Sequence, residues 1–152
     1  MGRRGARHTG VVRSRFRTGR LWSYGDIGPF KVTLAADAAL LFDFRRSLRD
    51  WLRASALTDE GRQAVVLAVH EAVANGIDHG TRGSPVLVEA RAEGADVIVD
   101  VTTAGSWVEH EADRCLDPRG RGFPLMCGLT DGLEVLAGGG SVTVRLRVAP
   151  GV

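Results

Sequence analysis

The chain has 152 residues, of which 44% are hydrophobic, and this suffices for one compact domain around a single core. No run approaches the roughly 18 apolar residues that cross a bilayer, and no apolar stretch typical of a secretory signal follows the basic N-terminus. We therefore expect a soluble cytoplasmic protein without membrane contact. Cys115 and Cys127 form no CxxC pair, so we expect reduced thiols and neither a zinc site nor a disulfide framework.

The net charge of +2 hides an asymmetry between the N-terminus and the rest of the chain. Residues 1–25 contain seven arginines and no acid, whereas residues 26–152 contain 13 basic and 18 acidic residues. Because the first segment has few large apolar residues, burial cannot offset its ordering entropy, and we predict a disordered basic tail over 1–25. We predict a folded domain over 26–152. It shows no nucleic-acid motif, so we do not expect nucleic acid as a partner.

The first predicted elements are a strand and a helix. Alternating residues over 30–34 predict a half-buried strand, and Asp37 is a plausible cap for a helix over 38–54. Apolar residues recur on this helix at three- and four-residue spacing, namely Leu41, Phe44, Leu48, Trp51 and Leu52. Four arginines collect elsewhere on it, namely Arg45, Arg46, Arg49 and Arg53. They form either a solvated face or a docking surface for an acidic partner protein.

A second helix is predicted from a Thr58 cap to about His79, and it carries the most informative motif of the chain. Glu71, Asn75 and His79 are four residues apart, so they share one face, while an apolar stripe occupies the opposite face. A carboxylate and a carboxamide one turn apart can divide the work of phosphoryl transfer: the carboxylate handles a proton and the amide oxygen binds Mg²⁺. On spacing alone, a solvated helix face remains the alternative.

Most of the remaining elements are strands. Residues 86–92 and 97–101 predict an antiparallel hairpin, and residues 133–136 and 142–148 predict a second one around three glycines. Since helices come mainly early and strands mainly late, the pattern is not a βαβ series. We predict an α+β fold, a two-layer sandwich in which helices cover one face of a mixed, mostly antiparallel sheet.

Between the two hairpins, Gly120 and Gly122 precede an apolar run of helical character. Backbone N–H groups at such a helix start can face an anion without a Cβ in the way, so a phosphate would fit there. A single GxG before a helix is weak evidence, because glycines also occur in turns.

The order ExxxNxxxHG, hairpin, loop, GRGxxLM and strand pair resembles the Bergerat-type (GHKL) ATP-binding fold of gyrase and histidine kinases. The flanks in AVHEAVANGIDHG and the segment GRGFPLMCGLTD make the chain most similar to the anti-sigma-factor serine/threonine kinases. The resemblance covers residues 29–148. It implies ATP and Mg²⁺ as cofactors, with a sigma factor and an anti-sigma antagonist as protein partners. The sequence leaves open whether the chain forms a homodimer.

The resemblance also assigns roles by position. Glu71 would be the general base and Asn75 the Mg²⁺ ligand, while His79 would close the nucleotide-facing end of the helix. Asp78 either assists the metal or is solvated. Residues 106–119 would form a lid over the phosphates. The other implied nucleotide-binding residues are Thr103, Gly105, Gly120, Arg121, Gly122, Phe123 and Thr143, with Ser141 as an alternative to Thr143.

The chain departs from the family pattern at Thr103. Related kinases carry DxG after the second hairpin strand, and the Asp accepts a hydrogen bond from the adenine amino group. Asp100 is a poor substitute, because three positions along a strand reverse the side chain to the other face. A neutral bond in place of a charge-assisted one weakens recognition by about 1–2 kcal/mol.

Two functions follow. The first is an ATP- and Mg²⁺-dependent serine/threonine protein kinase that binds a sigma factor and phosphorylates an anti-sigma antagonist. The alternative is a catalytically weak or inactive module of the same fold that sequesters a transcription regulator. Thr103 favours the module, whereas the presence of both Glu71 and Asn75 favours the kinase.

Overall fold

The computed structural model describes residues 27–105 and 122–151 of the chain. The predicted tail over 1–25, the predicted lid over 106–119, and the positions Gly120 and Arg121 lie outside the described residues.

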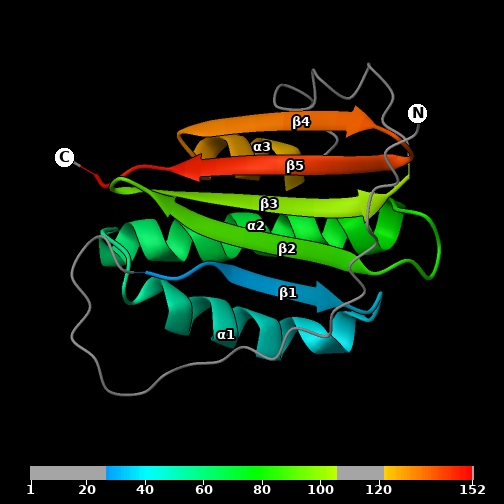
Figure 1. Ribbon diagram of the computed structural model, residues 1–152, viewed down its shortest axis with the longest axis horizontal. Coiled ribbons are helices and arrows are strands. Elements are labelled where there is room, and N and C mark those ends of the chain that lie inside the picture. The colour runs from blue at the N-terminus through cyan, green and yellow to red at the C-terminus, as the bar shows by residue number, and fades with distance from the viewer. Residues whose placement is uncertain (1–26, 106–121, 152) are drawn as a thin grey trace, which may run out of the picture.

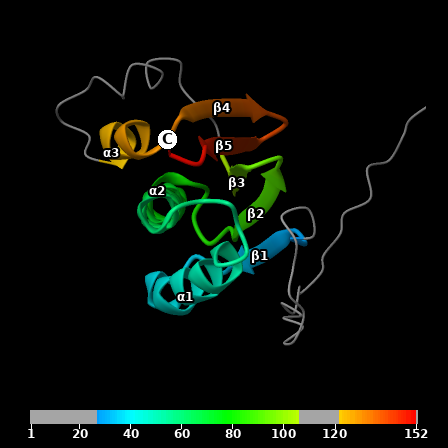
Figure 2. The same ribbon diagram turned by 90° about the vertical axis from the view of Figure 1, so that its left-hand side faces the viewer.

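The described chain is a five-stranded sheet with helices on one face (Figures 1 and 2). The elements in chain order are β1 (Phe30–Leu34), η1 (Ala38–Leu40), α1 (Leu41–Leu52), α2 (Asp59–His79), β2 (Val86–Glu93), β3 (Asp96–Ala104), α3 (Gly122–Leu129), β4 (Gly132–Gly138) and β5 (Ser141–Val148). The strand order is β1-β2-β3-β5-β4, and each neighbouring pair is antiparallel. The predicted α+β, two-layer class is confirmed.

The helix that was predicted over 38–54 has two parts. Asp37 accepts a hydrogen bond from the Ala39 N–H and caps the short 3-10 turn η1, and α1 then follows and ends at Leu52. The second helix begins where its cap predicts, because the Thr58 hydroxyl accepts the Gly61 N–H at 3.1 Å. It ends at Gly80, so α2 carries the whole motif from Glu71 to His79.

The core lies between the sheet and the helices. Strand alternation sends Val86, Val88 and Ala90 of β2 inward, and each of them is fully buried. In Figure 2, α2 lies between α1 and α3, and it buries side chains along most of its length. As the central helix, α2 packs against β3 and β5, and this places its last two turns over the middle of the sheet.

Two further expectations concern the cysteine thiols and membrane-spanning segments. Cys127 of α3 is disulfide-bonded, so the expectation of reduced thiols is wrong for this residue. No helix in the described part of the chain is long and apolar enough to span a membrane.

Candidate functional site

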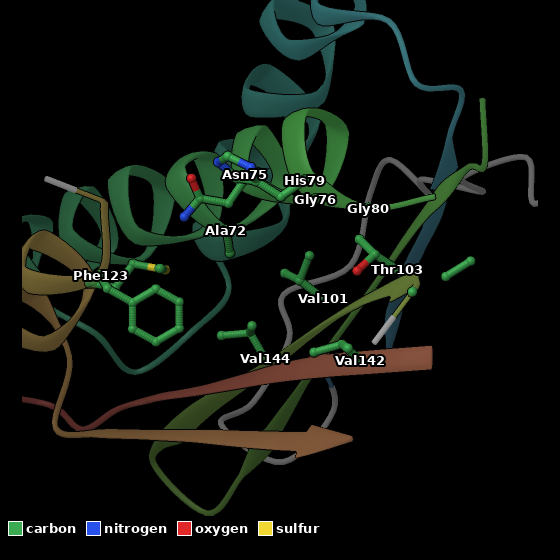
Figure 3. Close-up of a pocket in the computed structure, with 13 residues that line it drawn as sticks. Ala72, Asn75, Gly76, His79, Gly80, Val101, Thr103, Phe123, Val142 and Val144 are labelled. Atoms are coloured by element: carbon green, nitrogen blue, oxygen red, sulfur yellow. The ribbon is translucent and has the colours of Figure 1, made fainter. Parts of the chain in front are cut away.

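A pocket opens between α2, the inner face of β3 and β5, and the start of α3 (Figure 3). Its lining residues in the described chain are Ala72, Asn75, Gly76, His79, Gly80, Val101, Thr103, Ala104, Gly105, Phe123, Met126, Val142 and Val144. The pocket therefore brings together Asn75 and His79 from α2 with Thr103 and Gly105 from β3, although nearly 30 residues separate the two groups.

The α2 wall supplies two of the polar side chains at the pocket. Asn75 and His79 project from the same side of α2, as their spacing requires. Asn75 is half-buried, and its amide makes no hydrogen bond within the described residues. Because a neutral amide oxygen is a ligand type that Mg²⁺ accepts, this unengaged group fits a magnesium ion shared with phosphates.

The floor of the pocket is apolar. Val101 of β3 and Val142 of β5 are buried, and Phe123 and Met126 of α3 close the side. In the described lining, His79 is the only residue with an ionisable side chain. A slot of this kind suits a flat aromatic group such as a nucleotide base, whose faces are apolar and whose edge carries polar atoms.

Thr103 is packed directly against α2. A Cβ added at Gly76 would overlap the Thr103 Cγ2 atom, so the threonine methyl occupies the space that this glycine leaves open. Figure 3 shows the hydroxyl oxygen of Thr103 on the pocket side. Asp100, three positions earlier, lies on the opposite face of the sheet and binds Arg145. Among the described residues, the pocket therefore has a hydroxyl and no carboxylate at this point.

Backbone geometry completes the mouth of the pocket. Gly105 has φ +147°, a conformation that favours glycine, and its N–H donates to the Gly140 carbonyl at 2.9 Å. The Thr81 N–H donates to the Ala104 carbonyl at 2.8 Å, which ties the end of α2 to the end of β3. These bonds join the end of β3 to the segment after α2 and to the turn before β5.

Other expected site residues lie elsewhere. Glu71 is half-buried one turn before Asn75 on α2, and Asp78 is exposed; neither lines the described pocket. Thr143 is not brought to the pocket, because its hydroxyl lies 2.8 Å from that of Thr102 on the opposite face of the sheet. Ser141 does not line the pocket either, and its hydroxyl donates to the Gly138 carbonyl. Gly122 begins α3 next to the lining residue Phe123.

Sequence reasoning missed part of the lining. Val142 and Val144 flank Thr143 and point to the opposite side of β5, so strand alternation could have identified them once Thr143 was assigned outward. Gly76 follows Asn75 directly, but only the contact with Thr103 explains why a glycine occupies that position.

Comparisons with known proteins agree with this fold. The profile of the histidine kinase-like ATPase domain matches residues 34–148. The chain is also similar to the crystal structure of the RsbU and RsbW domains of Rv1364c from Mycobacterium tuberculosis, with 23% identity and a TM-score of 0.64. That likeness shows the fold; it covers 80% of this chain, which spans only 32% of the other chain. No curated protein sequence matches the chain significantly.

The matched segment contains every described helix and all strands except the first residues of β1. It also contains the whole described pocket, and membership of an ATPase domain family implies that the chain binds ATP. The chain belongs to the histidine kinase-like ATPase domain family.

Proposed function

We propose that the protein is an ATP- and Mg²⁺-dependent serine/threonine kinase of the anti-sigma type, which binds a sigma factor and phosphorylates an anti-sigma antagonist. The observation that carries this proposal is the unengaged Asn75 amide beside the apolar slot, with Glu71 one turn away on the same helix. The family match supports ATP as the nucleotide, and the resemblance of the motifs supports the class of partner.

In this mechanism the apolar slot would hold the base, and Asn75 of α2 would lie on the phosphate side of the nucleotide. Bound Mg²⁺ would neutralise charge on the phosphates, and Asn75 would hold it through the amide oxygen. The Glu71 carboxylate takes the proton of a serine hydroxyl as that oxygen bonds to the γ-phosphorus. The bond from the γ-phosphorus to the bridging oxygen breaks, and ADP leaves with the electron pair.

The surface of α1 supports a protein partner. Arg46 and Arg49 of this helix and Arg53 directly after it are exposed, and Phe42 is 63% exposed. Only Arg53 of these arginines has a salt bridge within the described residues, at 3.6 Å to Asp50. An acidic protein surface with an apolar spot complements this combination.

The test is transfer of γ-labelled phosphate from ATP to candidate antagonist proteins in the presence of Mg²⁺. Glu71→Gln should reduce transfer by about 10²- to 10⁴-fold while ATP affinity stays within a few-fold, because only proton abstraction is lost. Glu60→Gln is the matched control, since Glu60 is an exposed acid in the first turn of the same helix.

Two results would count against the proposal. Transfer at the wild-type rate by Glu71→Gln would show that another group accepts the proton. A wild-type chain that labels no antagonist, beside a Thr103→Asp variant that does, would show that the natural site is decayed.

Thr103 favours a second function, that of a non-catalytic module that sequesters a transcription regulator. The hydroxyl offers the base a neutral hydrogen bond where related kinases offer a charged one. Isothermal titration with ATP and ADP separates the two functions, because a module that no longer uses a nucleotide gives no heat at millimolar ligand.

A further inference from the structure

We propose that Thr103 makes the base end of the pocket tolerant of purines with a 6-oxo group, so that nucleotides of hypoxanthine and guanine bind alongside those of adenine. The inference rests on the nucleotide site of the proposed function and identifies the residue that sets its base selectivity.

The first step concerns the orientation of Thr103. Its methyl lies against Gly76, where an added Cβ would overlap it. Because β-branched side chains have few χ1 rotamers, placing the methyl there restricts the position of the hydroxyl. Figure 3 shows this hydroxyl oxygen on the side of the pocket that Val101 and Val142 line.

The second step concerns the free hydrogen-bonding capacity of this hydroxyl. Within the described residues, Thr103 Oγ1 makes no hydrogen bond, whereas the hydroxyl of its neighbour Thr102 is engaged with Thr143 at 2.8 Å. A free hydroxyl both donates and accepts. It can accept from the 6-amino group of adenine, or rotate its proton and donate to the 6-oxo group of hypoxanthine or guanine.

The third step concerns charge. The described lining contains no carboxylate, so no anionic side chain among the described residues would face the oxygen of a 6-oxo purine at Thr103. A carboxylate only accepts hydrogen bonds and would repel that oxygen, while the hydroxyl suits both kinds of base at similar strength. We therefore expect dissociation constants for the two kinds of nucleotide to lie within about tenfold of each other.

The test is isothermal titration of the full chain with ADP, IDP and GDP. IDP isolates the effect, because hypoxanthine differs from adenine only in its 6-oxo group and the adjoining ring N–H. We expect the wild type to bind ADP and IDP within tenfold. Thr103→Asp should tighten ADP and weaken IDP, so that their ratio rises at least tenfold. Thr103→Ser should keep the wild-type ratio, and Thr103→Val should weaken both ligands.

Thr102→Val is the matched control. It removes the same type of hydroxyl one residue away on the other face of β3, and nucleotide affinities should not change. Circular dichroism of each variant establishes that it is folded, and Thr103→Val alone decides the matter if Thr103→Asp does not fold.

The outcomes separate this inference from the function on which it rests. If the wild type binds ADP but binds IDP more than tenfold more weakly, the inference is wrong and the kinase proposal stands. Unchanged affinities in Thr103→Val would show that another residue contacts the edge of the base, and would also overturn it. If neither nucleotide binds, both proposals fail.

Discussion

The two faces of the central strand β3 carry polar groups of opposite character. On the open face, Thr102 and Asp100 are fully engaged: Thr102 with Thr143, and Asp100 with Arg145 at 2.8 and 3.0 Å. On the helix-covered face, Thr103 and the facing Asn75 make no hydrogen bond within the described residues. The polar groups that neighbouring strands satisfy stabilise the sheet, and those left without a partner beside a pocket are available to a ligand.

The open face is an ion-pair network over the outer sides of β2, β3 and β5. Arg91 also binds Asp100 at 3.2 Å, and Arg147 binds Asp96 at 2.7 Å. Burial works against the charged form of Asp100, but hydrogen bonds and charge from Arg145 and then Arg91 outweigh it, so the pKa of Asp100 lies below its ordinary value. These ion pairs therefore contribute to stability. The Asp100 carboxylate is bonded to two arginines and is not free to bind a ligand.

The largest effect that the comparison predicts is on the pocket side. Asn75→Ala should reduce phosphate transfer by on the order of a hundredfold or more and remove the Mg²⁺ dependence of ATP binding, because the amide oxygen is lost. Transfer assays and titrations with and without Mg²⁺ measure both. Gln63→Ala removes an exposed amide from the same helix and should change neither. If ATP binding by Asn75→Ala kept its full dependence on Mg²⁺, a residue other than Asn75 would hold the metal.

The contact between Gly76 and Thr103 predicts an intermediate effect. Gly76→Ala should lower the free energy of unfolding by about 1–3 kcal/mol, because the new Cβ overlaps the Thr103 methyl. Gly61→Ala is the matched control in the same helix, where the nearest atoms to a new Cβ are at 3.4 Å. It should stabilise the chain by up to about 1 kcal/mol through helix propensity. Urea denaturation measures both.

A double variant tests the cause of that loss. Thr103→Ser removes the overlapping methyl, so Gly76→Ala combined with Thr103→Ser should recover most of the lost stability. Strictly additive effects of the two substitutions would mean that the methyl contact is not responsible.

Substitutions on the open face should have the smallest effect on nucleotide binding and phosphate transfer. Asp100→Asn should lower the free energy of unfolding at pH 7 by about 1–3 kcal/mol, since charge-assisted bonds to two arginines are lost. Nucleotide affinity should stay at the wild-type value, in contrast to Asn75→Ala. Glu134→Gln, at an exposed acid on the same face, is the control and should change stability by less than about 0.5 kcal/mol.

The same substitution has a defined pH dependence. Because the folded-state pKa of Asp100 is lowered, its stabilising contribution is complete above the ordinary value of 3.8 and is lost as pH falls through the folded-state pKa. The stability difference between wild type and Asp100→Asn should therefore be constant near neutral pH and shrink below about pH 4. A difference that grows on acidification would contradict this assignment.

The elements themselves were accessible from the sequence. The cap at Thr58 and the glycine after His79 predicted both ends of α2, and alternation predicted all five strands within a few residues. The split of the first helix into η1 and α1 was not predicted, because one side-chain cap at Asp37 stabilises either type of turn. The class of fold followed from the order of elements.

The site was less accessible. The spacing of Asn75 and His79 predicted their shared face, whereas the assignment of Thr143 to the nucleotide is not supported by its place on the open face. Choosing between residues of β5 required the register that pairs Thr102 with Thr143 and Thr103 with Val142. One residue of shift would exchange the faces of β5, and the partner strand β3 lies some 40 residues earlier in the chain.

The sequence by itself determined which residues share a helix face or a strand face, because those relations depend on hydrogen bonds and caps between near neighbours. Tertiary structure alone decided that Gly76 meets Thr103 and that Thr103 faces the pocket. Such contacts depend on the packing of α2 against a sheet whose paired strands are some 40 residues apart, as Thr102 and Thr143 are. The free energy of such a contact depends on both packed surfaces, so neither segment of the chain determines it alone.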